Sequence, residues 1–256
     1  MKIKNSVAVV TGGASGLGEA VIRSIIEKGG RAAIFDFDEE RGSGLAADLG
    51  ESVIFCKTDV SDENSVKAAV DKTISELGAI HLAVNCAGVG TPKKVIDREG
   101  NPMPIEFFNR VIQINLIGTM NVIRLATVEM LKNQPNEDGE KGVVVNVASV
   151  AAFEGQIGQS AYSASKAGVV GMTLPLAREF APLGIRFNTI APGVFLTPMV
   201  AGLPEKAQAA LGQMMPFPKR LGKPSEFAML VGQMMENPML NGETIRLDAA
   251  LRMAAK

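Results

Sequence analysis

Short apolar, β-rich runs alternate with segments of helical periodicity along most of the chain, and this alternation constrains the fold more than any other feature. The runs are unbroken rather than alternating in polarity, as in strands that are buried on both faces. Seven strands are predicted, at residues 6–11, 32–35, 53–56, 82–85, 143–147, 185–190 and 242–247. Helices are predicted at residues 17–28, 39–49, 62–77, 107–132 and 161–180.

This order of elements predicts an α/β fold of Rossmann type. We expect a doubly wound parallel sheet of about seven strands, with helices on both faces and right-handed crossovers. No internal repeat or linker divides the 256 residues, so a single domain over residues 1–256 is predicted. Residues 91–104 and 196–224 interrupt the alternation of strands and helices. Both lie on the carboxyl side of the strands, where such sheets bind ligands, so they are predicted to be functional loops.

Composition and charge narrow the possible partners. A net charge of −1, with both signs mixed along the chain, argues against a nucleic-acid partner. We expect no apolar run that spans a bilayer and no targeting segment before the first strand, which together favour a cytoplasmic protein. Cys56, Cys86 and His81 are too few for a Cys/His metal cluster, so no metal site is predicted and the thiols are interpreted as buried and reduced.

The first predicted strand ends in a glycine-rich turn that opens a helix, TGGASGLG at residues 11–18. Gly12, Gly16 and Gly18 would permit a tight turn and let a pyrophosphate approach the free N–H groups of a helix N-terminus. The spacing is G-x-x-x-G-x-G rather than G-x-G-x-x-G. An ordinary glycine turn therefore remains an alternative interpretation of this segment alone.

Asp36 supports the dinucleotide interpretation. It follows the second predicted strand, where an acidic side chain can accept hydrogen bonds from a ribose 2′-hydroxyl. A 2′-phosphate would meet the carboxylate instead, and Ala14, Ser15 and Phe37 offer no compensating charge. The sequence therefore predicts NAD rather than NADP as the cofactor.

Two weaker signals follow the third and fourth predicted strands. Asp59 could accept a hydrogen bond from an adenine amino group, or it could simply begin a helix, although Asp62 fits that role better. Cys86, Ala87 and Gly88 are small enough to let a cofactor approach the backbone, and a structural turn is equally natural there.

Ser149, Tyr162 and Lys166 form the candidate catalytic set. Ser149 ends the fifth predicted strand, and the four-residue spacing of the chain's only tyrosine and Lys166 places both on one helical face. Oxidation of a secondary alcohol must remove its hydroxyl proton, and a tyrosine with a pKa of ~10 is a poor base at neutral pH. Lys166 and a positively charged nicotinamide are expected to lower that pKa, while Ser149 donates a hydrogen bond to the substrate oxygen. An isolated Y-x-x-x-K pair is usually only a solvated helix pair. Asn115 is a polar residue among apolar ones, and taken alone it is interpreted as a surface or helix-bending amide.

Together these features resemble the short-chain dehydrogenase/reductase family over essentially the whole chain. The resemblance rests on the turn at 11–18, residues 85–88, Asn115, Ser149, Tyr162 with Lys166, and Pro192-Gly193. Within the family, residues 149–156, 162–166, 171–175, 216–218 and 241–248, with the polar loop at 133–141, look like the subgroup of type-10 17β-hydroxysteroid dehydrogenases, also called short-chain 3-hydroxyacyl-CoA dehydrogenases.

The resemblance implies roles for individual residues and a homotetramer. It implies a catalytic set of Ser149, Tyr162, Lys166 and Asn115, with Asn115 holding a proton-relay water. It implies substrate contacts from Ser149, Gln159 and Tyr162. NAD contacts are implied for Gly12, Ser15, Gly16, Leu17, Gly18, Asp36, Asp59, Val60, Cys86, Ala87, Gly88, Tyr162, Lys166, Pro192, Phe195 and Thr197.

The expected activity is the NAD-dependent interconversion of a (3S)-3-hydroxyacyl-CoA and its 3-ketoacyl-CoA, with Tyr162 as general acid/base. Residues 91–104 and 196–215 match the subgroup less closely, and Met199, Met214 and Met215 could form an adaptable apolar wall or ordinary core. A hydroxysteroid or another secondary alcohol is the alternative substrate. Asp36 disfavours NADPH-dependent reduction of 3-ketoacyl-carrier protein. A non-catalytic dinucleotide-binding subunit of a larger assembly is a further alternative.

Overall fold

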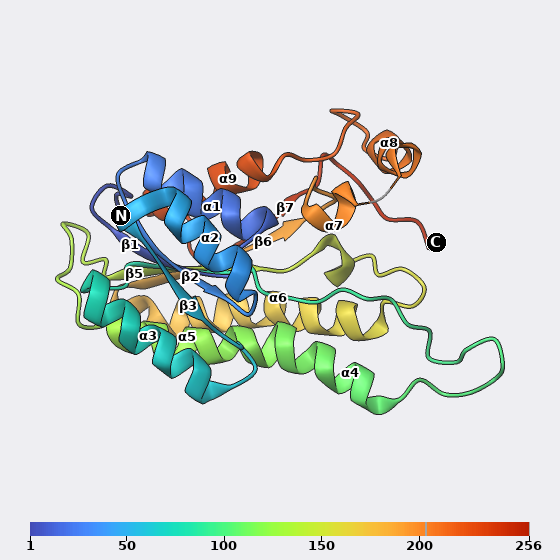
Figure 1. Cartoon of the computed structure of the whole chain (residues 1–256), viewed down its shortest axis with the longest axis horizontal. Coiled ribbons are helices and arrows are strands. Elements are labelled where there is room, and N and C mark those ends of the chain that lie inside the picture. Colours follow the sequence, from blue (N-terminus) through green and yellow to red (C-terminus); the bar gives the residue numbers. More distant parts are fainter. Residues whose placement is uncertain (203, 256) are drawn as a thin grey trace.

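One parallel sheet organises the molecule (Figure 1). In the computed structural model, which describes residues 1–202 and 204–255, seven strands are hydrogen-bonded in the order β3-β2-β1-β4-β5-β6-β7. This confirms the predicted Rossmann-type sheet, whose order reverses between β1 and β4. The strands are β1 (Val7–Thr11), β2 (Arg31–Asp36), β3 (Val53–Lys57), β4 (Leu82–Asn85), β5 (Gly142–Val147), β6 (Ile185–Pro192) and β7 (Thr244–Leu247).

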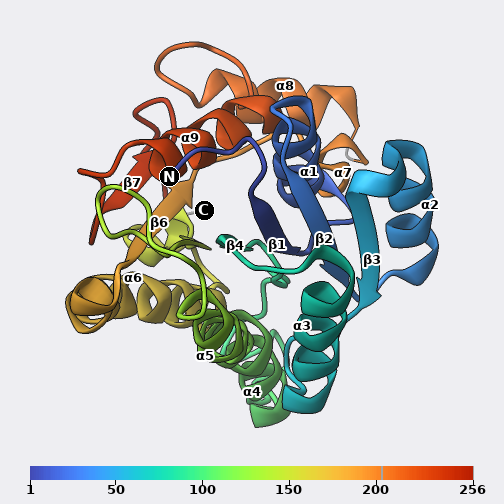
Figure 2. The same ribbon diagram turned by 90° about the vertical axis from the view of Figure 1, so that its left-hand side faces the viewer.

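Helices cover both faces of the sheet (Figure 2). On one face lie α1 (Gly16–Glu27), α2 (Glu39–Leu49) and α9 (Pro224–Glu236), and on the other lie α3 (Glu63–Leu77), α5 (Gly118–Met130) and α6 (Ser160–Phe180). The remaining helices are α4 (Ile105–Ile112), α7 (Pro198–Ala201) and α8 (Glu205–Gln213), with η1 (Gly50–Ser52), η2 (Gln113–Ile117), η3 (Val150–Ala152) and η4 (Ala181–Leu183) as short turns.

Each face of the sheet has its own apolar core, which explains why the strands are unbroken apolar runs. Along β1, Ala8 and Val10 pack into the core shared with α1 and α9, whereas Val7 and Val9 pack into the core shared with α3 and α5. Each of these valines is fully buried. Burial of a valine side chain contributes roughly 1.5–3 kcal/mol, so both faces of the strand stabilise the fold.

Two stretches are more helical than the sequence predicted. The predicted loop at 196–224 contains α7 and α8, and α9, for which no prediction was made, follows it. Helix α9 begins with Pro224, and the Glu226 carboxylate accepts a hydrogen bond from the Lys223 backbone N–H at 2.8 Å. Proline in the first turn and an acidic residue at the third position are a helix-start signature, and they explain why a helix begins here.

The long helix predicted at 107–132 is interrupted by the π-helical turn η2, which contains Asn115. The side chain of Asn115 is fully buried, so its interpretation as a surface amide is wrong, while the π-turn shows that the helix is irregular at this residue. The hydroxyl of Thr119 donates a hydrogen bond to the Asn115 carbonyl oxygen at 2.8 Å. Single π-turns inside α-helices occur frequently at functional sites.

The helix over Ile105–Met130 is long and apolar enough, by length and composition alone, to cross a membrane. This corrects the expectation that no apolar stretch approaches that length. Its Val122, Ile123 and Ala126 side chains are buried in the core beneath the sheet, as those of a core helix are, and a single match of this kind is weak evidence for a membrane span.

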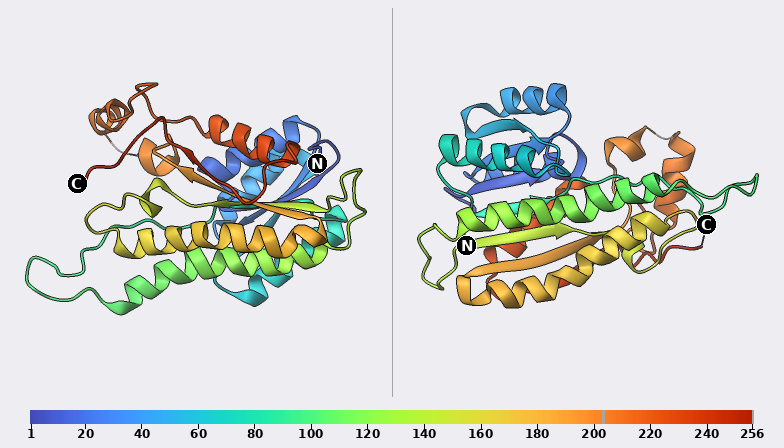
Figure 3. Two further views of the ribbon diagram at one scale, coloured as in Figure 1. Left: turned by 180° about the vertical axis from the view of Figure 1, so that it is seen from behind. Right: turned by 90° about the horizontal axis from the view of Figure 1, so that it is seen from below.

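The two stretches predicted as functional loops lie at one end of the molecule (Figure 3). The segment between β4 and α4 projects from the same end as α8 and the C-terminal residues. Within it, the backbone N–H of Lys93 donates to the Gly158 carbonyl oxygen at 2.8 Å, which joins this segment to the one that precedes α6.

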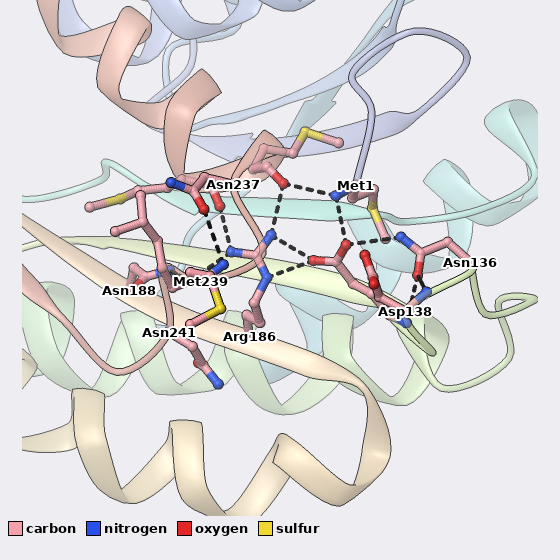
Figure 4. A network of polar contacts seen from close by, with 12 residues as sticks. Met1, Asn136, Asp138, Arg186, Asn188, Asn237, Met239 and Asn241 are labelled. Atoms are coloured by element: carbon pink, nitrogen blue, oxygen red, sulfur yellow. Dashed lines mark hydrogen bonds and ion pairs between the residues drawn. The ribbon is translucent and has the colours of Figure 1, made fainter.

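A buried ionic network lies at the opposite end of the sheet (Figure 4). The Arg186 guanidinium bonds to one carboxylate oxygen of Glu140, with nitrogen–oxygen distances of 2.6 and 2.7 Å, and both side chains are nearly inaccessible. Arg186 also donates to the carbonyl oxygens of Met234 and Leu240 at 2.6 and 2.7 Å. The Met1 amino group contacts the second Glu140 oxygen at 2.6 Å. The network thereby ties β6 to the end of α9.

Candidate active site

A cleft of about 910 Å³ opens at the carboxyl ends of β1, β2 and β4, where the strand order reverses. Ligands of open α/β sheets bind at such a reversal. The cleft brings together most of the residues predicted to contact the cofactor. Those that line it are Gly12, Ser15, Gly16, Leu17, Gly18, Asp36, Asp59, Val60, Cys86, Ala87, Gly88 and Thr197.

The N-terminus of α1 fits a bound pyrophosphate. Ser15 precedes the helix without a side-chain hydrogen bond to its first turn, so the first backbone N–H groups face the cleft without a cap. Gly12 has a φ of +61°, and a Cβ there would lie 3.0 Å from the Ala87 backbone. Glycine is therefore required where the strand turns into the helix.

Asp36 occupies the position expected for recognition of the adenosine ribose. One of its carboxylate oxygens accepts a hydrogen bond from the Ala14 backbone N–H at 2.9 Å, and the other accepts from the Asp38 N–H at 3.0 Å. These two bonds orient the carboxylate toward the cleft and leave further lone pairs, since an ionised carboxylate has about four acceptor sites. The group can therefore accept hydrogen bonds from ribose hydroxyls.

Arg41 also lines this part of the cleft, and the sequence reasoning missed it. Its guanidinium lies 3.5 Å from the Asp38 carboxylate, an ion pair between exposed side chains. Arg41 comes five residues after Asp36, on the first turn of α2, so it lies beyond the residues that directly adjoin Asp36 in the sequence. A cation is thus present near the ribose end, although it already has an acidic partner.

Asp59 is held by its own loop. One carboxylate oxygen accepts hydrogen bonds from the backbone N–H and the hydroxyl of Ser61, at 2.9 and 2.6 Å. The helix-start role belongs to Asp62, whose carboxylate accepts from the Asn64 N–H. Asp59 is therefore left to line the cleft rather than to cap α3.

Ser149 and Tyr162 meet beside the cleft. The Ser149 hydroxyl oxygen accepts a hydrogen bond from the Ala151 backbone N–H at 3.1 Å, which leaves its own proton free to be donated. The Ser149 hydroxyl is close enough to the Tyr162 phenol to lower its pKa. A Cβ at Gly90 would lie 3.4 Å from the Tyr162 ring, so the ring packs against the loop that follows β4.

Lys166 is buried behind Tyr162, one turn further along α6. Its ammonium group donates to the Val147 carbonyl oxygen at the end of β5, at 2.7 Å. A Cβ at Gly88 would lie 3.5 Å from the same nitrogen, so the ammonium borders the cofactor cleft. Burial lowers the pKa of Lys166 to about 8.

The pKa of Tyr162 departs from the sequence-based expectation. Burial raises the pKa of the phenol above its ordinary value, and the hydrogen bond with Ser149 offsets only part of this effect. The expectation that Lys166 lowers this pKa is therefore not met by the chain's own groups. The physical reason is that desolvation of the phenolate outweighs the hydrogen bond that favours it.

The family model described as short chain dehydrogenase matches residues 6–208. The chain belongs to this family. A 3-hydroxyacyl-CoA dehydrogenase type-2 from Drosophila melanogaster is 53% identical over 252 residues, which cover 98% of this chain and 99% of the relative. The human protein of the same name is 50% identical, with 98% and 97% covered. The crystal structure of 3-hydroxyacyl-CoA dehydrogenase type-2 from Mycobacterium avium superposes with a TM-score of 0.94 at 42% identity, covering both chains completely.

As a short-chain dehydrogenase, the chain is an oxidoreductase that uses a nicotinamide dinucleotide. The fit of the cleft to such a cofactor rests on the uncapped α1 N-terminus, the close approach at Gly12 and the oriented Asp36 carboxylate. Residues that line the cleft but were not predicted include Phe35, Phe37, Arg41, Thr58, Ser61, Val89, Arg110, Gln113, Ile114 and Pro198.

Four of the predicted cofactor contacts lie outside the lining of the cleft. Tyr162 and Lys166 border it from α6, as described above. Pro192 ends β6 and is buried. The Phe195 ring is buried edge-on against Phe227, at a centroid distance of 6.4 Å, and lines a separate cavity of about 220 Å³. Its side chain is thus part of the core.

The Asn115 amide is committed to protein partners. Its oxygen accepts from the Val89 backbone N–H at 2.8 Å, and its nitrogen donates to the Val89 carbonyl oxygen at 2.9 Å and to the Ser165 hydroxyl at 3.0 Å. This side chain therefore joins α6 to the loop that borders the cleft. The proton-relay water implied by the family resemblance remains a prediction.

The other predicted residues have mixed positions. Gln159 precedes α6 and is half-buried, and its side-chain oxygen accepts from the Gln156 N–H at 3.0 Å. Met215 is core and Met214 is exposed, while the Met199 side chain lies outside the described residues. In the part of the chain that the structure describes, no group of three metal-ligating side chains gathers. Cys56 is buried, whereas Cys86 is only half-buried and borders the cleft.

Proposed function

We propose that this short-chain dehydrogenase interconverts 3-hydroxyacyl-CoA and 3-ketoacyl-CoA thioesters with NAD as its cofactor. The observation that carries the proposal is the placement of Ser149, whose hydroxyl influences the Tyr162 phenol, and of buried Lys166 at the border of a dinucleotide cleft. The relatives that are 50 and 53% identical over nearly their whole length are named 3-hydroxyacyl-CoA dehydrogenases, which supports the substrate class.

The chemistry divides between the cofactor and three side chains. The dinucleotide, when bound, supplies the hydride donor or acceptor. In the reducing direction, the Tyr162 hydroxyl gives its proton to the ketone oxygen as that oxygen gains negative charge. Ser149 donates a second hydrogen bond to the same oxygen and holds it beside Tyr162. In the oxidising direction, the phenolate of Tyr162 takes the hydroxyl proton of the substrate.

We infer that Lys166 supports the phenolate electrostatically only together with the bound cofactor, since burial outweighs its effect in the chain alone. Its ammonium is anchored to the Val147 carbonyl oxygen and lies 5.8 Å from the centroid of the Tyr162 ring. With a pKa of about 8, most Lys166 side chains are protonated at neutral pH. A positive charge at this distance favours the deprotonated form of the phenol. We infer that the cationic nicotinamide of the oxidised cofactor adds to this effect when it is bound.

The preference for NAD over NADP rests on Asp36. Its carboxylate, fixed by the Ala14 and Asp38 N–H groups, suits two ribose hydroxyls and repels a 2′-phosphate. Arg41 could attract a phosphate, but its pairing with Asp38 reduces that attraction. We therefore propose NAD as the physiological cofactor.

A substrate panel with NADH tests the substrate class. We expect the catalytic efficiency for acetoacetyl-CoA to exceed that for a 17-ketosteroid and for a simple cyclic ketone by at least tenfold. Equal or higher efficiency with the steroid would move the assignment to the hydroxysteroid alternative. The homotetramer is proposed on the family resemblance, and light scattering should then give four chain masses. A cytoplasmic location is likewise a proposal, which cell fractionation tests.

A further inference from the structure

The segment between Ser149 and Tyr162 has no strand to fix its path. It consists of η3, residues 153–159 and the first turn of α6, and its two ends carry the groups that would meet the substrate oxygen. A small displacement of this segment would therefore change how those two groups align. What holds the segment in place bears directly on the reaction.

Arg246 of β7 is hydrogen-bonded to the middle of this segment. Two of its guanidinium nitrogens bond to the two carboxylate oxygens of Glu154, at 2.7 and 2.8 Å. The guanidinium also lies 5.3 Å from the centroid of the Phe153 ring. Both charged side chains are partly buried, with 21 and 26% of their surfaces exposed. A bidentate, partly desolvated pair of this kind fixes geometry better than an exposed one.

The C-terminal tail runs beside the same segment. The backbone N–H of Ile157 donates to the Ala255 carbonyl oxygen at 3.0 Å, and the Gln156 amide donates to the Ala254 carbonyl oxygen at 3.1 Å. Arg246 holds the start of this tail, since it donates to the Leu251 carbonyl oxygen at 3.0 Å. The Arg246 guanidinium thus bonds both to the segment between Ser149 and Tyr162 and to the C-terminal tail that lies along it.

Two further charges complete the cluster. The Asp248 carboxylate, nearly buried, accepts from Arg246 at 2.7 Å and from Arg252 at 3.1 Å. Arg252 also lies 3.4 Å from Glu154. The Arg246 guanidinium holds the pKa of Glu154 below its usual range, so this carboxylate stays charged at neutral pH.

Further hydrogen bonds connect this cluster to Gln159, the predicted substrate contact. The N–H of Gln156, whose side chain binds the tail, donates to the side-chain oxygen of Gln159 at 3.0 Å. A chain of bonds therefore leads from β7 through the tail to the half-buried amide that precedes α6. The segment is held on its other side by the bond between Lys93 and Gly158.

We propose that Arg246 is a positioning residue for the reaction. Through Glu154 and residues 251–255 it fixes the segment that carries Ser149 and Gln159, and so sets how the substrate carbonyl meets the proton donor. The inference deepens the proposed function and rests on it for the identity of the substrate. It assigns catalytic importance to an ion pair that makes no contact with the cofactor cleft.

The test compares Arg246→Met with a distant control, Arg124→Met. Methionine keeps the aliphatic length and removes the charge, and Arg124 of α5 forms a single exposed ion pair with Glu63 of α3 at 3.0 Å. We expect Arg246→Met to lower kcat/KM for acetoacetyl-CoA at least tenfold while the Kd for NADH stays within twofold. Glu154→Gln should have a similar effect, and the double variant should be no worse than either single variant.

Hydrogen exchange provides a readout that needs no substrate. In Arg246→Met the amides of residues 154–159 should exchange at least tenfold faster, while those of β1 and β4 stay unchanged. If the ketoacyl thioester is not a substrate of the unaltered protein, the proposed function fails. The exchange data still test whether Arg246 holds residues 154–159 in place. Unchanged exchange in this segment, or an equal loss of NADH affinity and of kcat/KM, would overturn the inference.

Discussion

The ammonium group of Lys166 lies 5.8 Å from the centroid of the Tyr162 ring; Lys166 is buried and Tyr162 is half-buried. Burial acts on the two groups in opposite directions. It raises the pKa of the phenol and lowers the pKa of the amine to about 8. Each group is thus biased toward its neutral form, and the positive charge of an oxidised nicotinamide would be needed to favour the phenolate.

This relationship predicts an optical titration. The chain has one tyrosine and no tryptophan, so the ultraviolet absorbance of the phenolate reports Tyr162 alone. The reference is a model tyrosine, whose pKa is ~10. Without cofactor, the tyrosine should titrate above that value, and NAD⁺ should lower its pKa by at least one unit. Ser149→Ala should raise the pKa further, because a hydrogen bond that favours the phenolate is lost. A titration unaffected by NAD⁺ would contradict this account of activation.

The buried charge of Lys166 should lower the free energy of unfolding of the protein. The lowering of the Lys166 pKa from 10.5 to about 8 corresponds to a free-energy cost of about 3 kcal/mol for keeping the side chain charged in the fold. This cost already includes the favourable hydrogen bond to the Val147 carbonyl oxygen. Lys166→Met should therefore stabilise the cofactor-free protein at pH 7 by roughly 1 kcal/mol and abolish most activity. Since the unfolded chain binds more protons between pH 8 and 10.5, wild-type stability rises across that window and the difference shrinks. Denaturant unfolding at pH 7 and pH 10 measures this, and a destabilised variant at pH 7 would refute it.

Cofactor preference should depend on Asp36 and Arg41 together. Asp36→Ala removes the acceptor for the ribose hydroxyls and the repulsion of a 2′-phosphate, so kcat/KM should fall at least tenfold with NADH and rise with NADPH. The gain with NADPH should require Arg41, which lines the same part of the cleft. In an Asp36→Ala, Arg41→Ala double variant the gain should disappear. Retention of full NADH preference in Asp36→Ala would show that the discrimination lies elsewhere.

The ionic network at the far end of the sheet should matter for stability alone. Arg186→Met leaves the buried Glu140 carboxylate with fewer partners and strips the carbonyl oxygens of Met234 and Leu240 of a donor. We expect a loss of about 3–5 kcal/mol in the free energy of unfolding. The exposed pair of Arg220 and Glu226 supplies the control, because Arg220→Met should cost less than about 1 kcal/mol. Equal losses in the two variants, measured by urea unfolding, would contradict the prediction.

The sheet could be predicted from the sequence because the residue pattern of each strand indicates by itself that the strand is buried. Val7 to Val10 are apolar and buried on both faces, and so short an apolar run between turn signals is typical of a buried strand. The turn at residues 11–18 and the position of Asp36 after β2 depend only on local order along the chain, so the cofactor cleft followed from them. The Tyr162 and Lys166 pair was found in the same way, through helical spacing.

Features that depend on distant contacts could not be predicted. Arg246 and Glu154 are 92 positions apart, and nothing in either local sequence indicates the other. The burial of Asn115 depends on its bonds to Val89 and Ser165, from two other elements. The direction of the Tyr162 pKa shift likewise depends on how much of the ring the fold removes from water, which helical spacing does not reveal.

The most direct test follows NADH consumption at neutral pH with acetoacetyl-CoA, for the unaltered protein and for Tyr162→Phe, with NADPH in parallel. We predict rapid turnover with NADH, little with NADPH, and a loss of at least a hundredfold in kcat for Tyr162→Phe, the scale expected for a general acid. Turnover with NADPH alone, or a Tyr162→Phe variant as active as the unaltered protein, would contradict the account.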